Sequence, residues 1–420
     1  MSIILPQLTV QHDFLSVIAD VQDGTIPEEP FWVSCYKENS PSVHAKVNVW
    51  RKPGGGVELT PQGIELLKGE HQGVYTAACP SLNVPPTRLR GPRQNIGEET
   101  AKPTQISAFD VAPDGSLYAT GDGNGNLRVS STSGHGKVLA SKPHLSTILS
   151  LRFFPSSKVI LTSSNDFTVS IISAEDLAVP RTLKGHSRAV TDTGIIARGK
   201  NVLSCSKDGT LRLWDVASAS QIRVWGVKDY SPVSKMALGP RDGDHNLQPP
   251  DGESTESAAL SIDPREVETT DKVVFVGLHN GSFQAFDLGT KTPFYQSEPP
   301  TGSKIPLESM VYSGADHILA TGSRKGVITV YDTRQISTPL FSFKRNDASI
   351  EDLVFVPTDT DEVRLGIASA DGLPYVASIR PEGPRVVDEL VGYNCDSVRN
   401  IKVSGKSIWT TGDDGIVRRY

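Results

Sequence analysis

The sequence predicts an all-β protein, namely a seven-bladed β-propeller that follows a small β-rich N-terminal domain. A strand–turn–strand segment recurs over residues 100–420 with a period near 42 residues. Within each repeat, alternating apolar residues and closely spaced turn residues indicate short antiparallel strands. The composition agrees, because 37 Gly and 29 Pro among 420 residues favour turns, and only 3 Met argue against a helical bundle. A β-sandwich with coincidental spacing is the alternative.

The repeated segment joins a strand of small residues, a tight polar turn and an alternating strand. Successive turns are separated by 42, 42, 72, 45, 46 and 43 residues, so one insertion of about 30 residues is expected in the long gap. A single four-stranded unit cannot bury both faces, whereas a ring of units buries each sheet against its neighbours. The segments are 118–129, 160–171, 202–213, 274–285, 318–330, 365–376 and 408–419, with turns at Gly125, Phe167, Gly209, Gly281, Gly326, Gly372 and Gly415.

The third unit carries the Gly-His … Trp-Asp pattern that is typical of a WD-repeat blade. A His before the inner strand, a Ser on the next strand, an Asp in the turn and a Trp indole can satisfy one another's hydrogen bonds inside a blade. We therefore expect a buried polar relay. Its predicted members are His186, Ser206, Asp208, Trp214 and Asp215.

The repeat also divides the chain into domains. Residues 1–83 form the predicted N-terminal domain, with a hairpin from 31–36 and 44–51 and a further strand near 73–79, and residues 84–420 form the propeller. The last unit lacks a fourth strand, and residues 84–90 echo the outer strand of another unit, so they are predicted to close the ring. Residues 239–272 carry nine acidic residues and little apolar periodicity, which predicts a flexible acidic insertion.

Composition excludes several classes of protein. The net charge of −6 disfavours a general nucleic-acid binder. No stretch has the roughly 18 apolar residues needed to span a bilayer, and the N-terminus lacks the features of a signal peptide. Four scattered cysteines predict a reduced intracellular protein without a disulfide framework or zinc site. They are Cys35, Cys79, Cys205 and Cys395.

Three fragments resemble chemical motifs but fail in context. The acidic run that begins at Asp242 lacks the glycine of a calcium loop, having Leu247 there. The glycines 121, 123 and 125 precede a strand, whereas a phosphate loop opens a helix. The segment around Ser187 lacks the second glycine of a nucleophile elbow, and the nine His show no metal spacing. We expect no enzymatic activity, no cofactor and no metal site.

Aligning the inner strands of successive units predicts an acidic arc on one rim of the ring. Such an arc suits a basic protein partner through electrostatic steering; a solvated rim without a partner is the alternative. The acids are Asp192, Glu308, Asp347, Glu351 and Asp352, interrupted by Arg188, Lys235 and Arg399.

The third unit, with its Thr191-Asp-Thr and Arg198-Gly-Lys-Asn segments, and the Val-Arg-Arg-Tyr ending at Tyr420 resemble the proteasomal ATPase-associated factor family of WD-repeat proteins. This resemblance implies a non-catalytic assembly chaperone, present in cytoplasm and nucleus and monomeric. Its implied partners are the C-terminal domain of one proteasomal ATPase subunit and precursors of the base of the 19S regulatory particle.

Two other functions stay open. Residues 319–334 end in Tyr-Asp-Thr-Arg334, similar to the WDxR box that docks propellers to a ligase adaptor, so the chain could be a substrate receptor of a cullin ubiquitin ligase. An enzyme or small-molecule binder that uses the channel is the third possibility, although no motif favours it.

Overall fold

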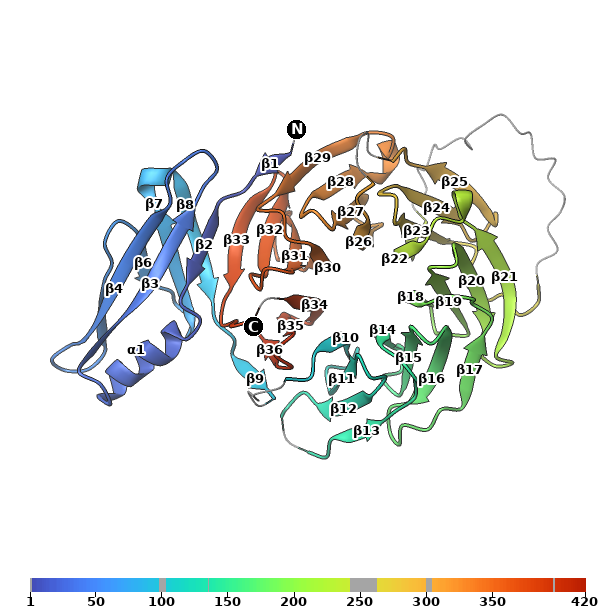
Figure 1. The fold of residues 1–420 in the computed structure, drawn as a ribbon, viewed down its shortest axis with the longest axis horizontal. Helices are drawn as coiled ribbons and strands as arrows, with labels where there is room; N and C mark the ends of the chain where they lie inside the picture. Colours follow the sequence, from blue (N-terminus) through green and yellow to red (C-terminus); the bar gives the residue numbers. More distant parts are fainter. Residues whose placement is uncertain (1, 98–102, 135, 242–262, 300–303, 396) are drawn as a thin grey trace.

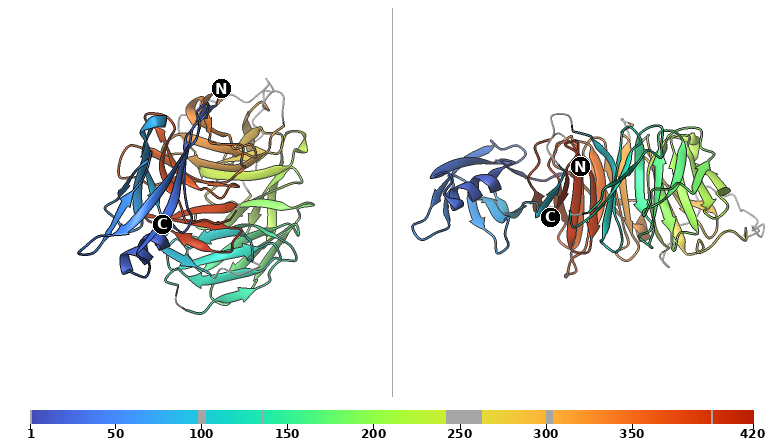
Figure 2. Two further views of the ribbon diagram at one scale, coloured as in Figure 1. Left: turned by 60° about the vertical axis from the view of Figure 1, so that its left-hand side comes forward. Right: turned by 90° about the horizontal axis from the view of Figure 1, so that it is seen from below.

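The computed structural model describes residues 2–97, 103–134, 136–241, 263–299, 304–395 and 397–420. Over these residues seven sheets surround a central channel, and the predicted all-β propeller is confirmed (Figure 1). The innermost strand of each sheet packs against the next, and the last packs against the first, so the ring is closed. Each sheet is antiparallel over its four blade strands, and Figure 2 shows the resulting flat disc.

We number the blades along the chain. Their strands are as follows: in blade 1, β10 (Ile106–Val111), β11 (Leu117–Asp122), β12 (Leu127–Ser131) and β13 (Leu139–Ser141); in blade 2, β14 (Ile148–Phe153), β15 (Val159–Ser164), β16 (Thr168–Ser173) and β17 (Arg181–Lys184); in blade 3, β18 (Val190–Ile196), β19 (Asn201–Ser206), β20 (Thr210–Asp215) and β21 (Ser220–Gly226); in blade 4, β22 (Val233–Pro240), β23 (Lys272–Leu278), β24 (Phe283–Asp287) and β25 (Thr292–Gln296); in blade 5, β26 (Leu307–Ser313), β27 (Ile318–Ser323), β28 (Ile328–Asp332) and β29 (Pro339–Lys344); in blade 6, β30 (Ile350–Val356), β31 (Val363–Ser369), β32 (Tyr375–Arg380) and β33 (Arg385–Leu390); in blade 7, β34 (Val398–Ser404), β35 (Ser407–Gly412), β36 (Val417–Arg419) and β9 (Gln94–Ile96). Short 3-10 turns η2 (Lys228–Tyr230) and η3 (Thr333–Gln335) lie between strands.

Closure of the ring differs from the prediction. The outer strand of blade 7 is β9, which pairs antiparallel with β36, and not the segment 84–90. That segment is β8 (Val84–Arg90), which pairs with β7 (Val74–Cys79) of the N-terminal domain and runs parallel to β33 of blade 6. Because β8 already has a hairpin partner, only the residues after it are available to complete blade 7. The N-terminal domain therefore extends through β8.

The N-terminal domain is held together by one apolar core. The predicted hairpin is present as β3 (Glu28–Tyr36) and β4 (Val43–Arg51). Strands β2 (Gln7–Val10) and β5 (Val57–Thr60) flank it, while β6 (Glu65–Lys68) pairs with β7, and the turn η1 (Pro80–Leu82) precedes β8. Strand β1 (Ile3–Ile4) adds to β29 of blade 5, so the domain is attached to two blades at the edge of the disc (Figure 2).

One helix, α1 (Phe14–Asp23), was not predicted from the sequence. It buries Phe14, Val17, Ile18 and Val21, which are spaced three and four residues apart and so lie on one face. Gly24 ends it with a left-handed φ of 80°. Both signals are readable in the sequence, but they span only ten residues and lie outside the repeat.

The long insertion lies within blade 4, between β22 and β23, and is only partly the acidic loop that was predicted. Residues 239 and 240 complete β22, and residue 272 begins β23. Residues 242–262 lie outside the described residues. The returning part is anchored on blade 3, where the Asn201 side chain accepts a hydrogen bond from the Val267 backbone (2.7 Å) and donates one to the Arg265 carbonyl (3.0 Å). In the described part of the chain, no helix is long and apolar enough to cross a membrane.

Candidate functional site

The same irregularity occurs in the innermost strand of all seven blades. Each strand has a register shift just after its first apolar residue, for example between Val190 and Asp192 or between Ile350 and Asp352. A bulge leaves one residue unpaired and turns its side chain away from the ladder. The seven bulge residues contribute to the lining of one cavity of about 300 Å³. They are Ser107, Leu149, Thr191, Ser234, Glu308, Glu351 and Arg399.

Two of the predicted acids, Glu308 and Glu351, belong to this set. The Glu308 carboxylate forms an ion pair with the Arg324 guanidinium at 2.5 Å, and the Glu351 carboxylate lies 3.6 Å from the Arg399 guanidinium. Arg399 is shared with Asp413, at 2.5 Å. Burial raises the pKa of Glu351, and Arg399 only partly offsets that effect. Each of these carboxylates therefore faces a cation.

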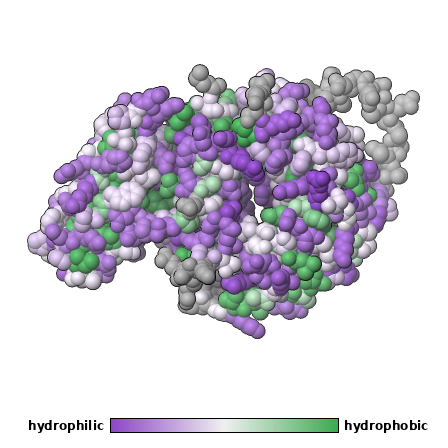
Figure 3. Space-filling model, in the orientation of Figure 1, coloured by the Kyte–Doolittle hydropathy of each residue, from purple (hydrophilic) through white to green (hydrophobic). Residues whose placement is uncertain are grey.

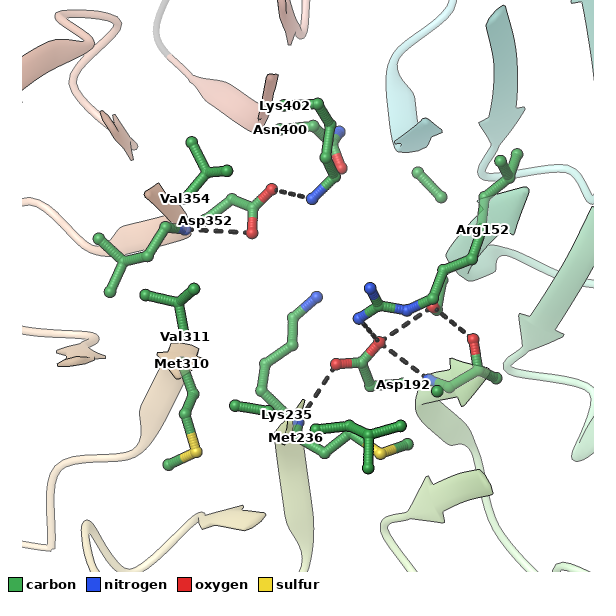
Figure 4. A pocket seen from close by; sticks show the side chains of 18 of the residues that line it. Arg152, Asp192, Lys235, Met236, Met310, Val311, Asp352, Val354, Asn400 and Lys402 are labelled. Carbon is green, nitrogen blue, oxygen red and sulfur yellow. Dashed lines mark hydrogen bonds and ion pairs between the residues drawn. The ribbon is translucent and has the colours of Figure 1, made fainter. Parts of the chain in front are cut away.

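The residue after the bulge lies one step further inside the channel, where Asp192 and Asp352 are found (Figure 4). Asp192 is 3% exposed and lies 3.2 Å from Arg152. It also accepts hydrogen bonds from the Ser150 hydroxyl and from the backbone N–H of Met236. Burial opposes its ionisation, but Arg152 and Lys235 together outweigh burial and lower the pKa of Asp192.

On the opposite side of the channel, Asp352 pairs with Lys402 at 2.6 Å. Lys235 points into the space between the two carboxylates (Figure 4). Burial disfavours its charge, but Asp192 and Asp352 outweigh that effect and raise the pKa of Lys235. Positively and negatively charged side chains thus alternate around the interior of the channel.

The structure corrects the predicted acidic rim. The strand alignment does bring Glu308 and Glu351 together at the mouth, but it places Asp192 and Asp352 inside the channel, because alternate strand positions face different directions. Asp347 is exposed in the preceding loop and pairs with Lys344 at 2.9 Å. All five acids have a cationic partner, so the arc is a mosaic of ion pairs.

The buried relay of blade 3 is present with three of its five predicted members, His186, Asp208 and Trp214. The His186 ring accepts or donates at both nitrogens, 2.8 Å from Asp208 and 2.7 Å from Ser204. The Trp214 indole N–H donates to the same Ser204 hydroxyl at 2.8 Å. The predicted Ser206 is on the same strand face but lies one step nearer the turn, where it accepts from the Asp208 backbone N–H and donates to the Arg188 carbonyl.

Asp215 is also not part of the relay. It follows Trp214 directly, so it points to the opposite face of the strand, where it accepts hydrogen bonds from Ser218. The relay therefore consists of His186, Ser204, Asp208 and Trp214. Thr210 completes it by donating to Asp208 at 2.6 Å.

Blade 2 contains a second relay that the sequence analysis missed. His144 contacts Asp166 at 3.0 Å and Thr162 at 2.9 Å, and Thr168 donates to Asp166. Each residue lies 42 positions before its counterpart in blade 3. Ile172 occupies the position that corresponds to Trp214, so blade 2 lacks the Trp-Asp pair by which the relay of blade 3 was recognised in the sequence.

Both relay histidines are buried, and burial favours the neutral form of each imidazole ring. Burial lowers the pKa of His144 and of His186, and the neighbouring aspartates offset this only in part. The hydrogen bonds from His186 and Thr210 lower the pKa of Asp208 despite its burial. Within the described residues, no group of three or more His, Cys, Asp and Glu side chains could hold a metal ion.

Comparison with known proteins matches this geometry. The WD domain, G-beta repeat family model matches residues 136–173 and 178–215. Each match spans the outer strand of one blade and the first three strands of the next, namely β13–β16 and β17–β20. The chain is 27% identical over 296 residues to the 26S proteasome regulatory subunit RPN14 of Saccharomyces cerevisiae, covering 69% of this chain and 68% of that protein. It is 26% identical over 164 residues to the probable proteasomal ATPase-associated factor 1 of Dictyostelium discoideum, covering 38% of each.

Similarity to other WD-repeat proteins is shorter. The nuclear distribution protein PAC1 of Arthroderma benhamiae is 26% identical over 52% of this chain and 56% of its own length. The generic repeat therefore accounts for part of the likeness, while the match to RPN14 extends over more of the chain. The chain is a WD-repeat propeller protein, and its resemblance to the proteasomal ATPase-associated factors is confirmed.

Proposed function

We propose that this protein is a non-catalytic assembly chaperone that binds the C-terminal domain of a proteasomal ATPase subunit while the base of the 19S regulatory particle is built. The observation that carries the proposal is the similarity to two proteins named for the proteasome, a regulatory subunit and an ATPase-associated factor. The proposal includes action in cytoplasm and nucleus as a monomer. Precursors of the base would be bound through the same ATPase subunit.

The channel mouth supports this proposal by its chemistry. Glu308 and Glu351 are part-exposed at the mouth, and their cations Arg324 and Arg399 belong to neighbouring turns and strands. A partner with basic side chains can exchange these ion pairs for its own at little net cost, because exposed pairs contribute only about 0–1 kcal/mol. Docking of this kind is reversible, as a chaperone that leaves the finished particle requires.

The test is co-purification followed by charge reversal. Tagged full-length chain should recover free ATPase subunits or base precursors, identified by mass spectrometry. Glu308→Lys with Glu351→Lys should slow association and reduce its salt dependence. Asp359→Lys is the matched control, since Asp359 is 89% exposed in the turn after β30, at the opposite end of that strand.

Two results would count against the proposal. Recovery of mature 26S particles alone, or of no proteasomal subunit, would remove the chaperone function. Equal binding by the double variant and the control at low salt would leave the function in place but remove the mouth as its site.

A substrate receptor of a cullin ubiquitin ligase is the second candidate. Arg334 lies in the turn η3, nearly half exposed, and is oriented by Asp332 at 2.6 Å. This is the end of the Tyr-Asp-Thr-Arg segment that resembles an adaptor-docking box. Adaptor binding that is lost on Arg334→Ala would favour this candidate, and lack of adaptor binding by the unaltered chain would remove it.

A further inference from the structure

One turn position breaks the rule that the other blades follow. In blades 1 and 3 to 7 the turn between the second and third strands holds a glycine with φ between 73° and 88°. They are Gly125, Gly209, Gly281, Gly326, Gly372 and Gly415. Blade 2 has Phe167 there, with φ 72°, and its side chain is 46% exposed.

Glycine is favoured at this position for two physical reasons. A left-handed φ is strained for any residue with a Cβ. Neighbouring loops also approach closely: a Cβ on Gly125 would lie 2.3 Å from the His144 carbonyl oxygen, and one on Gly209 would lie 2.5 Å from that of Tyr230. A large, half-exposed aromatic in this conformation contributes little to the core, and such strain persists typically at functional sites.

Two further exposed apolar side chains lie on the same face. Leu145 is 89% exposed, and its backbone N–H donates to Asp166 at 2.9 Å, which places it beside Phe167. Tyr230 is 68% exposed, also has a positive φ of 47°, and packs against the turn at Gly209. Leu145 and Tyr230 occupy equivalent positions, three residues before the innermost strands of blades 2 and 4.

Cations surround these apolar groups. Arg188, Lys207 and Lys228 are exposed, and none has an ion pair with another described residue. The nearest acids, Asp166 and Asp208, are already engaged by the buried histidines, and Asp229 is exposed among the cations. The local excess of exposed charge is positive, although the whole chain carries −6.

We propose that this surface, the apolar–basic band, binds an acidic peptide segment that carries large apolar side chains. The band consists of Leu145, Phe167, Arg188, Lys207, Lys228 and Tyr230. All six lie in loops at the end of blades 2 to 4 that faces the channel mouth. Each loop either joins the outer strand of one blade to the innermost strand of the next, or joins the second strand of a blade to its third. Figure 3 shows hydrophobic residues among hydrophilic ones on the face toward the reader, below and to the right of the channel.

The chemistry of the occupant follows from complementarity. Exposed aromatic and aliphatic side chains gain free energy when they are covered by apolar groups. Unpaired arginine and lysine side chains select carboxylates, through steering and charge-assisted hydrogen bonds. The band adjoins the mouth, because Lys207 lines the same cavity as Glu308 and Glu351, but it selects ligands of the opposite charge. The acidic segment proposed here is therefore a different ligand from the basic surface proposed for the mouth.

The test is selection from a random dodecapeptide library displayed on phage, using the full-length chain as bait. The enriched peptides should be acidic and contain at least one large apolar residue. Synthetic copies should bind about tenfold more weakly to Phe167→Gly and to the double variant Arg188→Glu with Lys207→Glu. Val138→Ala and Lys158→Glu, which alter exposed residues elsewhere, should bind as the unaltered chain does.

The glycine variant separates binding from folding. Phe167→Gly relieves the left-handed strain, so its midpoint of thermal unfolding should equal or exceed that of the unaltered chain. Basic or uncharged consensus peptides, no enrichment, or equal binding by the band variants would each overturn the proposal. A concentration-dependent dimer that Phe167→Gly abolishes would also overturn it, because a second copy would then be the occupant.

Discussion

Replacing Ser204 by alanine tests the relay of blade 3 most directly. The Ser204 hydroxyl is fully buried and is the shared partner of the Trp214 indole N–H and of the His186 ring. Its loss leaves two buried polar groups, the Trp214 indole N–H and the His186 ring nitrogen, without this partner. Each such group costs about 1–3 kcal/mol, so we expect Ser204→Ala to lower the free energy of unfolding by about 2–6 kcal/mol.

Ser206→Ala is the matched control. Ser206 lies two residues along the same strand and has the same chemistry, but its hydroxyl accepts from the Asp208 backbone and donates to the Arg188 carbonyl at the turn. Ser206→Ala removes hydrogen bonds to backbone groups at the turn, beside the exposed Arg188 and Lys207, and leaves no buried indole or imidazole unpaired, so we expect a smaller loss of about 0.5–1.5 kcal/mol. Chemical denaturation followed by tryptophan fluorescence and circular dichroism measures both variants.

A double-mutant cycle gives the coupling between the two groups. Trp214→Phe keeps most of the packing and removes the indole N–H. If Ser204 and Trp214 interact as the structure has them, their double variant should be more stable than the sum of the single losses predicts, by about 1 kcal/mol. Equal losses for Ser204→Ala and Ser206→Ala, or additive losses in the cycle, would refute the relay as described.

Three further outcomes are expected. Burial lowers the pKa of His144 and His186 below that of the unfolded chain, so the unfolded state binds more protons below about pH 6.5 and the free energy of unfolding should fall as the pH drops through that value. The dependence of this free energy on pH, measured by urea titration, should be weaker in the double variant His144→Gln with His186→Gln, and an unchanged dependence would contradict the assignment. Asn201→Ala should release residues 263–271 from blade 3, which limited proteolysis with mass spectrometry would report as faster cleavage there, whereas Asn165→Ala should leave the digest unaltered. Phe167→Gly should stabilise the chain by up to about 1 kcal/mol, and a clear loss in differential scanning calorimetry would mean that the aromatic ring is a core contact.

The repeat itself could be predicted from sequence because it depends on local rules. Strand alternation, turn glycines and the period of 42 residues are properties of consecutive residues, and they located the inner strands correctly enough to align their bulges. The closing strand could not be assigned in the same way. Both 84–90 and 94–96 are short and extended, and only the prior pairing of β8 with β7 decides between them.

The sequence also could not identify hydrogen-bond and ion-pair partners that lie on different strands or blades. The choice of Ser204 over Ser206 depends on a diagonal contact between strands, and side-chain parity alone allows either. The cations that neutralise the acids of the predicted rim come from other blades or other turns: Arg152 faces Asp192 across blades 2 and 3, and Lys402 faces Asp352 across blades 6 and 7. A one-dimensional alignment of acids has no access to these pairs.

The propeller makes departures from its own repeat informative. Seven blades share one bulge and, in six of them, one turn glycine, so these positions are set by the fold, and a residue that differs there is not required by it. The residue type at the bulge varies between blades, and Glu308, Glu351 and Arg399 are its charged members, whereas Phe167 replaces the glycine that the other six blades have at the turn. The first group sits at the mouth as ion pairs that a basic partner can exchange, whereas Phe167 lies beside unpaired cations. At the turn, Phe167→Gly introduces the residue that the other six blades use, so it removes the exposed aromatic side chain without removing a requirement of the fold. This is why Phe167→Gly separates recognition from stability more cleanly than an alanine variant, which would keep the left-handed strain.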